Sequence, residues 1–176
     1  MCEKSKNSFD KVLCINYITL LKSIAVGIFA GLSAILFRAV LTKSSDLLHM
    51  LLSFGQNHPV FIPIWLIVLL VFALLTTLLL KWEPLISGSG IPQVEGELYG
   101  HFEQKWWRVL LAKFLGGLLT IGSGLALGRE GPSVQLGAMA GKGISKIGKS
   151  GSDENRLLIT CGASAGLAAA FNAPLA

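Results

Sequence analysis

Charged residues are scarce in this 176-residue sequence, where Asp, Glu, Lys and Arg together make up 14% of the chain. Hydrophobic residues make up 52%, and the mean hydropathy is +0.64. Soluble domains carry about 25% charged residues, so this composition excludes a soluble fold and indicates an integral membrane protein. The net charge of +5 does not indicate nucleic-acid binding. The basic residues lie mostly in short segments between apolar runs, which is the pattern of a membrane topology signal.

Residues that hold metals or do hydrolytic chemistry are also rare. The three cysteines and three histidines show no metal or redox spacing, and the cysteines cannot form a disulfide framework. They are Cys2, Cys14, Cys161, His49, His58 and His101. Residues 162–166 spell the GxSxG of a serine hydrolase, but no His or acid follows Ser164 to complete a triad. We therefore expect no enzymatic activity, no metal site and no cofactor.

Two long apolar runs predict membrane-spanning helices. The first covers about residues 13–41, which is longer than the roughly 20 residues a perpendicular helix needs, so it is tilted or extends past the hydrocarbon. The second covers residues 60–80 and has no charge before Lys81. The segment 42–59 between them contains one basic residue, and we expect it to be an external loop.

Basic residues and tryptophans orient the chain in the membrane. Residues 1–11 hold three lysines, which places the segment 1–18 in the cytoplasm and leaves 19–176 as one membrane domain. Trp82 and the pair Trp106-Trp107 stand at either end of the next segment, as interfacial anchors do. Neighbouring basic residues make this side cytoplasmic as well.

The segment 87–100 is too short and too polar to cross a membrane. It opens with Gly88-Ser89-Gly90-Ile91-Pro92, in which glycines free the backbone and a proline can start a helix. The pattern predicts a loop followed by a short half-helix. From composition alone, an ordinary turn is the alternative.

A second break lies at Gly128-Arg129-Glu130-Gly131-Pro132, inside about forty apolar or small residues. The pattern predicts one helix over 109–127 and another that has Pro132 in its first turn. Irregular backbone at membrane depth is tolerated only in protein or beside water, and an intramembrane carboxylate is a functional hypothesis by default. The alternative for Glu130 is an ion pair with Arg129.

Small residues recur every fourth position in several runs and predict close helix packing. We expect the 137/141 stripe to pack beside the break against the stripe of the preceding helix, and a last helix over 157–171. These stripes are Ser23, Gly27 and Gly31; Gly116, Thr120 and Gly124; Gly137 and Gly141; and Gly162, Gly166 and Ala170.

The two glycine-proline loops share one chemical design. Each begins a helix, and a helix N-terminus offers free N–H groups and a positive dipole end to an anion. Broken helices aim such ends at anionic substrates in transporters. Glu130 would compete with the anion for the same positive ends and would act as a gate and a proton carrier.

Three motifs carry a resemblance to the CLC family of chloride channels and chloride/proton antiporters. They are GSGIP at 88–92, GREGP with its continuation SVQLG at 128–137, and GLAAAFNAPLA at 166–176. The resemblance implies an all-α polytopic membrane fold with re-entrant, broken helices, forming the first of two inverted repeats of a CLC-type pore.

The resemblance also implies roles for individual residues. Ser89, with Gly90, Ile91 and Gly131, would bind chloride, and Glu130 would be the gating and proton-carrying glutamate. Serine at position 89, where nitrate-preferring plant relatives carry proline, favours chloride. We expect Arg129, Lys113 and Glu95 to support the pathway, the last two as buried charges.

The same resemblance implies chloride as the substrate, protons as a coupled ion in an antiporter, and a homodimer in the lipid bilayer of the inner or plasma membrane. The family completes its ion site with a second half, which this sequence does not include. Pro174 reads as the start of another helix, so we expect a piece of a longer protein. The alternative function is a non-conducting fragment that needs a second half or a partner. The choice between a voltage-gated-type channel and an antiporter stays open.

Overall fold

The computed structural model describes residues 17–55, 61–125 and 127–173. These residues form six α-helices and one short 3-10 helix, with no strand among them. The predicted all-α fold is therefore confirmed. The basic segment 1–11 and Pro174 lie outside the described residues.

The first described helix, α2 (Tyr17–Gly55), is longer than predicted. The expected loop over 42–59 is wrong for residues 42–55, which continue the helix, and the rest of it lies outside the described residues. The polar run after Leu41 occupies little more than one turn, and a second leucine-rich stretch with no proline or glycine break follows it. At 1.5 Å per residue the helix is ~58 Å long, against ~30 Å of hydrocarbon. It also includes residues 17 and 18, assigned by sequence to the cytoplasmic segment.

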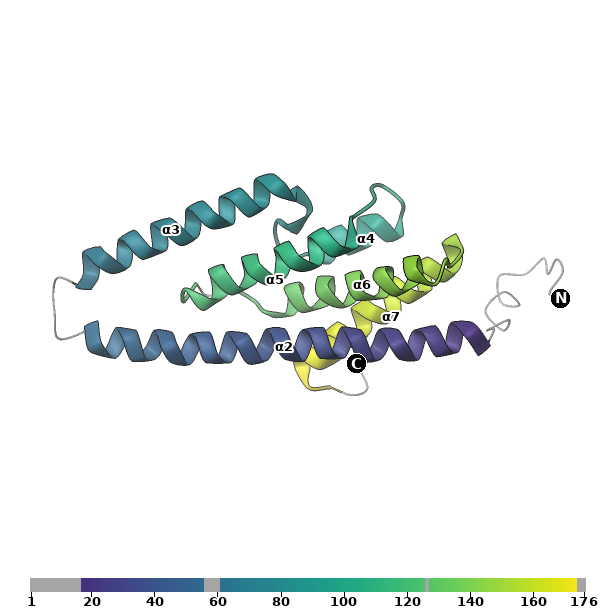
Figure 1. Ribbon diagram of the computed structural model, residues 1–176, viewed down its shortest axis with the longest axis horizontal. Helices are drawn as coiled ribbons and strands as arrows, with labels where there is room; N and C mark the ends of the chain where they lie inside the picture. Colours follow the sequence, from purple (N-terminus) through teal and green to yellow (C-terminus); the bar gives the residue numbers. More distant parts are fainter. Residues whose placement is uncertain (1–16, 56–60, 126, 174–176) are drawn as a thin grey trace.

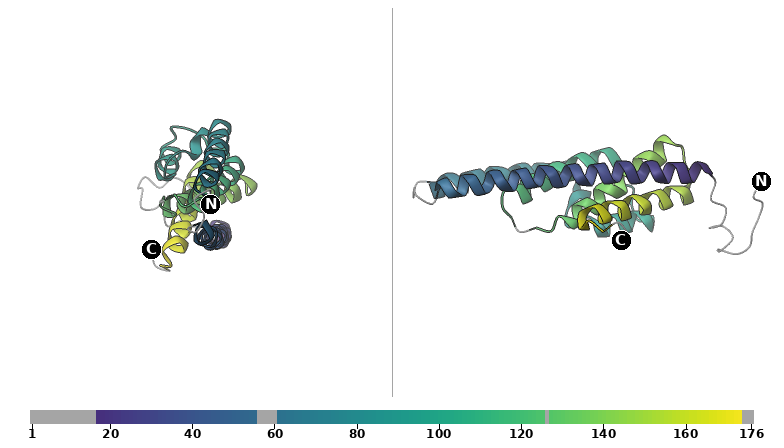
Figure 2. Two further views of the ribbon diagram at one scale, coloured as in Figure 1. Left: turned by 90° about the vertical axis from the view of Figure 1, so that its left-hand side faces the viewer. Right: turned by 90° about the horizontal axis from the view of Figure 1, so that it is seen from below.

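Helix α3 (Phe61–Trp82) confirms the span predicted over 60–80. It and α2 are the two described helices long and apolar enough to cross a membrane. The two lie on opposite sides of the molecule, with α5 and α6 between them (Figure 1), and the end-on view in Figure 2 agrees. None of the α3 residues is fully buried, and much of its apolar surface is exposed, as suits contact with lipid, while Leu79 and Leu80 pack against the core.

The polar segment after α3 has the predicted form. A 3-10 helix, η1 (Pro84–Ile86), is followed by bends and then by the half-helix α4 (Ile91–Leu98). A turn and an irregular stretch then lead to α5 (Trp106–Gly122). The aromatic anchors at the two ends of this segment come together, because the rings of Trp82 and Trp107 lie 6.3 Å apart. The Arg108 guanidinium sits over both rings.

The break before α6 (Glu130–Ile147) begins earlier than predicted. Helix α5 ends at Gly122, so the helix expected over 109–127 is wrong for residues 123–125 and 127. Gly124 adopts φ +94, a left-handed conformation that ends a right-handed helix and that glycine tolerates. Pro132 lies in the first turn of α6, as predicted.

Helix α6 is the central element and packs against α2, α4, α5 and α7 (Ser152–Phe171). A β-carbon on Gly137 or Gly162 would strike the backbone of the other residue, so both must be glycine for the helices to approach. The expectation that the 137/141 stripe faces the stripe of α5 is wrong; it faces α7. That helix also starts five residues before the predicted 157, where Asp153 and Glu154 favour a helix N-terminus.

The small-residue stripe predicted on α2 does not pack within the described chain. A β-carbon on Gly27 or Gly31 would meet nothing within 4 Å. The buried face of α2 runs instead through Val26, Ala30, Ala34, Phe37 and Leu41. Larger apolar side chains such as Ile28, Phe29 and Leu32 are exposed on α2, so side-chain size does not decide which face turns inward.

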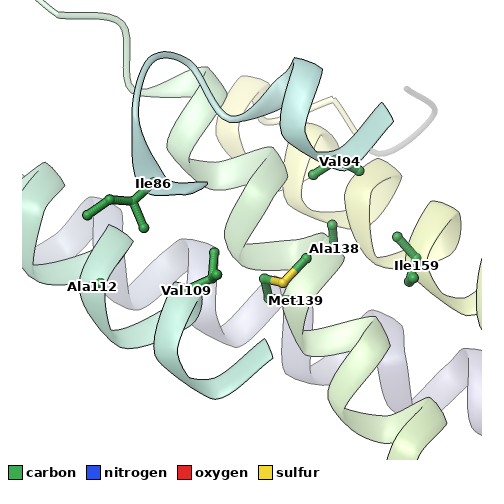
Figure 3. Close-up of a cluster of buried hydrophobic side chains, with 7 residues drawn as sticks. All are labelled: Ile86, Val94, Val109, Ala112, Ala138, Met139 and Ile159. Carbon is green, nitrogen blue, oxygen red and sulfur yellow. The ribbon is translucent and has the colours of Figure 1, made fainter. Parts of the chain in front are cut away.

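Two buried clusters hold the loops and helices in place. One joins η1, α4, α5, α6 and α7, and Figure 3 shows its side chains converging between these elements. It consists of Ile86, Val94, Val109, Ala112, Ala138, Met139 and Ile159. The other joins α2 to α5 and α6 around Phe37, which packs edge-on against Phe114 with ring centroids 5.5 Å apart.

Candidate anion site

The first loop of the site turns on two glycines in left-handed backbone conformations. Gly88 has φ +65 and Gly90 has φ +94, and residues with side chains rarely adopt such angles. Gly90 is the N-cap of α4, and Pro92 lies in the first turn. The first N–H groups of α4 have no partner within the helix and are available to a ligand.

The N-terminus of α6 lies in contact with this loop. A β-carbon on Gly131 would collide with the carbonyl oxygen of Ser89 and would lie 3.0 Å from its carbonyl carbon and Cα. Only glycine allows so close an approach. The structure thus brings the starts of α4 and α6 together, although about forty residues separate them.

A cavity of about 560 Å³ opens at this meeting point. Its walls come from the first loop, from α5 and from the start of α6, with apolar side chains of α3 and α5 behind them. The polar or backbone-exposing positions in its wall include Ser87, Gly88, Ser89, Ile91, Lys113, Gly128, Glu130 and Gly131. Gly90 is buried and does not line the cavity; it faces α6 instead.

Glu130 is the first residue of α6 and lines the cavity with an exposed side chain. Its Oε2 would lie 3.6 Å from a β-carbon on Gly128, so the carboxylate folds back over the break. Within the described residues it forms no ion pair with Arg129, which is exposed and does not line the cavity. The alternative role of Glu130, an ion pair with Arg129, therefore has no support in this geometry.

Two further charges singled out by sequence have different surroundings. Lys113 is buried at 5% exposure, and its Nζ donates to the carbonyl oxygens of Ile86 and Gly88, each at 2.8 Å. The expectation that Glu95 is buried is wrong: its side chain is exposed and lies outside the cavity wall. On a short helix the face is set by packing, and Val94 and Glu97 face the protein.

Sequence reasoning missed a buried polar network that joins α4 to α6 outside the cavity wall. The Glu97 carboxylate is paired with Lys142 of α6, and both are almost fully buried. Lys142 also donates to the backbone oxygen of Gln104, whose Nε2 donates to the Gln93 oxygen at 2.7 Å. The signal available in the sequence was the three-residue spacing of Val94 and Glu97, which puts the acid on the apolar face of the half-helix.

Replacing Lys142 with methionine should strongly destabilise the protein. The change leaves the Glu97 carboxylate buried without its cation, which costs about 3–5 kcal/mol for pairs of this kind. The matched control is Lys146→Met, because Lys146 lies 3.9 Å from Glu103 in an exposed pair and should contribute less than about 1 kcal/mol. Thermal unfolding of the purified variants in detergent measures both. Equal melting temperatures would contradict the assigned role of the buried pair.

Comparison with known proteins places these features in context. Residues 71–176 match the family model described as voltage gated chloride channel. The chain is similar to a solved structure, the X-ray crystal structure of a slow cyanobacterial Cl−/H+ antiporter, with a TM-score of 0.81 and 38% sequence identity. The match covers 89% of this chain and 37% of the antiporter chain.

Proposed function

The chain belongs to the voltage-gated chloride channel (CLC) family, and on this basis we propose that it supplies one half of the anion pathway of a membrane chloride transporter. The observation that carries the proposal is the contact between Ser89 and Gly131, which joins the starts of α4 and α6 at one cavity. Two positive helix ends directed at one space favour an anion.

Chloride would be held in this cavity by partial charges. The Ser89 hydroxyl and the N–H groups around Gly90, Ile91 and Gly131 are donors that carry no full positive charge. Such a site binds an anion firmly enough to select it and weakly enough to release it. Lys113, the cation in the cavity wall, already donates to two backbone carbonyls, so two of its three N–H donors are engaged.

Glu130 would act as the gate. Its carboxylate lies at the same helix start as the anion and carries the same charge, so the two exclude one another. When the carboxylate is protonated or moves aside, the cavity is open to chloride. A carboxyl group that binds a proton when chloride enters, and releases it when the carboxylate takes the place of chloride, would also link the movements of the two ions. This supports transport of the Cl−/H+ antiporter kind named for the similar solved structure.

Partners and location follow from the same assignment. The protein lies in a membrane, and we place it in the inner or plasma membrane, with the N-terminus in the cytoplasm and a homodimer as the working unit. Chloride is its substrate, and residues 19–176 form the N-terminal half of the transport domain. No organic cofactor or metal ion is part of this proposal.

Chloride efflux is the direct test of the proposed function. The protein produced from its natural gene is reconstituted in liposomes loaded with chloride, and efflux is followed with a chloride electrode. Efflux well above that of empty liposomes is expected. Its absence in protein that is folded by circular dichroism and runs as a single species in detergent would contradict the assignment.

Replacing Ser89 with proline should shift anion preference from chloride toward nitrate. The change removes the only side-chain hydroxyl at the centre of the first loop and alters its backbone. We expect the chloride-to-nitrate flux ratio to fall several-fold. Thr77→Ala, which removes an exposed hydroxyl on α3 outside the cavity wall, is the control and should change the ratio little. An unchanged ratio in Ser89→Pro would remove Ser89 from the site.

A further inference from the structure

Gln135 of α6 is fully buried and binds the beginning of the first loop, at Leu85. Its Nε2 donates to the carbonyl oxygen of Leu85 at 3.0 Å and to Oε1 of Gln104 at 3.1 Å. Both partners are acceptors, so the NH₂ group of the amide must lie on their side. Only this orientation of the amide allows both hydrogen bonds to form.

This orientation brings the amide oxygen of Gln135 against Gly90. A β-carbon on Gly90 would lie 2.5 Å from that oxygen and 2.8 Å from Cβ of Gln135. Among the described residues the oxygen has no hydrogen-bond partner, and it lies beside the positive start of α4. Gln135 therefore touches both ends of the loop that carries Ser89, and it does so one helical turn beyond Gly131.

Four consecutive carbonyls of this loop accept hydrogen bonds from side chains. Those of residues 85, 86, 87 and 88 accept in turn from Gln135, Lys113, Gln93 and again Lys113, at distances of 2.8–3.0 Å. The next carbonyl, of Ser89, packs on Gly131. Carbonyl oxygens engaged in this way are not free to turn toward an anion, which they would repel.

We propose that Gln135 is a positioning residue for anion discrimination: it anchors the loop of residues 85–90 to α6, so that the starts of α4 and α6 keep a constant separation. The inference rests on the proposed chloride transport. A site of constant size discriminates between chloride and nitrate, which differ in radius and hydration. A loop that is free to move would accept both anions.

The test compares Gln135→Met with Leu136→Ala in liposomes. Methionine keeps the length of the side chain and removes both donors and the acceptor. The chloride-to-nitrate flux ratio should then fall at least threefold toward one. Leu136→Ala is the matched control, since Leu136 is equally buried on the same helix but faces Phe37 and α2. It should lower the melting temperature and leave the ratio unchanged.

The outcomes are distinct. If the parent protein moves no chloride, the proposed function is contradicted. If the parent moves chloride and the chloride-to-nitrate ratio of Gln135→Met equals that of Leu136→Ala, only the role of Gln135 is overturned. If Gln135→Met yields no folded protein, Gln104→Met takes its place. It removes one of the two acceptors and should shift the ratio in the same direction by a smaller factor. An unchanged ratio in that variant would also overturn the inference.

Discussion

Replacing Glu130 with glutamine is expected to leave chloride efflux intact or make it faster and to abolish its dependence on pH. The carboxylate at the start of α6 lies in the cavity wall, where under the proposed mechanism it would compete with the anion. Glutamine keeps the size of the side chain but has no charge and takes up no proton. Proton movement coupled to chloride, where the parent shows it, should fall to background.

Efflux from proteoliposomes at acidic and at neutral pH measures this change, with proton uptake recorded in parallel. The control is Glu95→Gln, because that acid is exposed on α4 and lies outside the cavity wall. It should keep the pH response of the parent. A Glu130→Gln protein that also keeps that response would show that Glu130 is not the gate.

Replacing Gly131 with alanine is expected to weaken chloride binding by about tenfold or more, equivalent to ~1.4 kcal/mol. The added methyl group has nowhere to go, because the atoms it would meet are the backbone of Ser89. Flexible side chains can move aside cheaply, whereas here one of the two helix starts must shift. The donors of α4 and α6 would then no longer converge on one ion.

Isothermal titration of the purified protein with chloride measures this loss. Gly27→Ala is the control, since a β-carbon there meets nothing within 4 Å and Gly27 lies in the interior of α2. Alanine should stabilise that helix by about 0.5–1 kcal/mol and leave chloride affinity unchanged. Wild-type affinity in Gly131→Ala would mean that contact between the two loops does not shape the site.

Features that depend on a few neighbouring residues could be predicted from the sequence. The apolar run at 60–80 predicted α3, and Pro92 and Pro132 predicted the starts of α4 and α6. These are local effects, since a proline ring and an unbroken apolar stretch act whatever surrounds them. The loops at 88–92 and 128–132 could be recognised in the same way, because their glycines and prolines act locally.

Features that depend on which surfaces meet were decided by the tertiary structure. The sequence offered several small-residue stripes and two acids on α4, and it could not say that Gly137 meets α7, that Gly27 meets nothing, or that Glu97 rather than Glu95 is buried. Burial follows from the partner that a face receives, and that partner is distant in the chain. Gln135 reads as an ordinary polar residue of a mixed helix until α4 and the loop of residues 85–90 fold onto it.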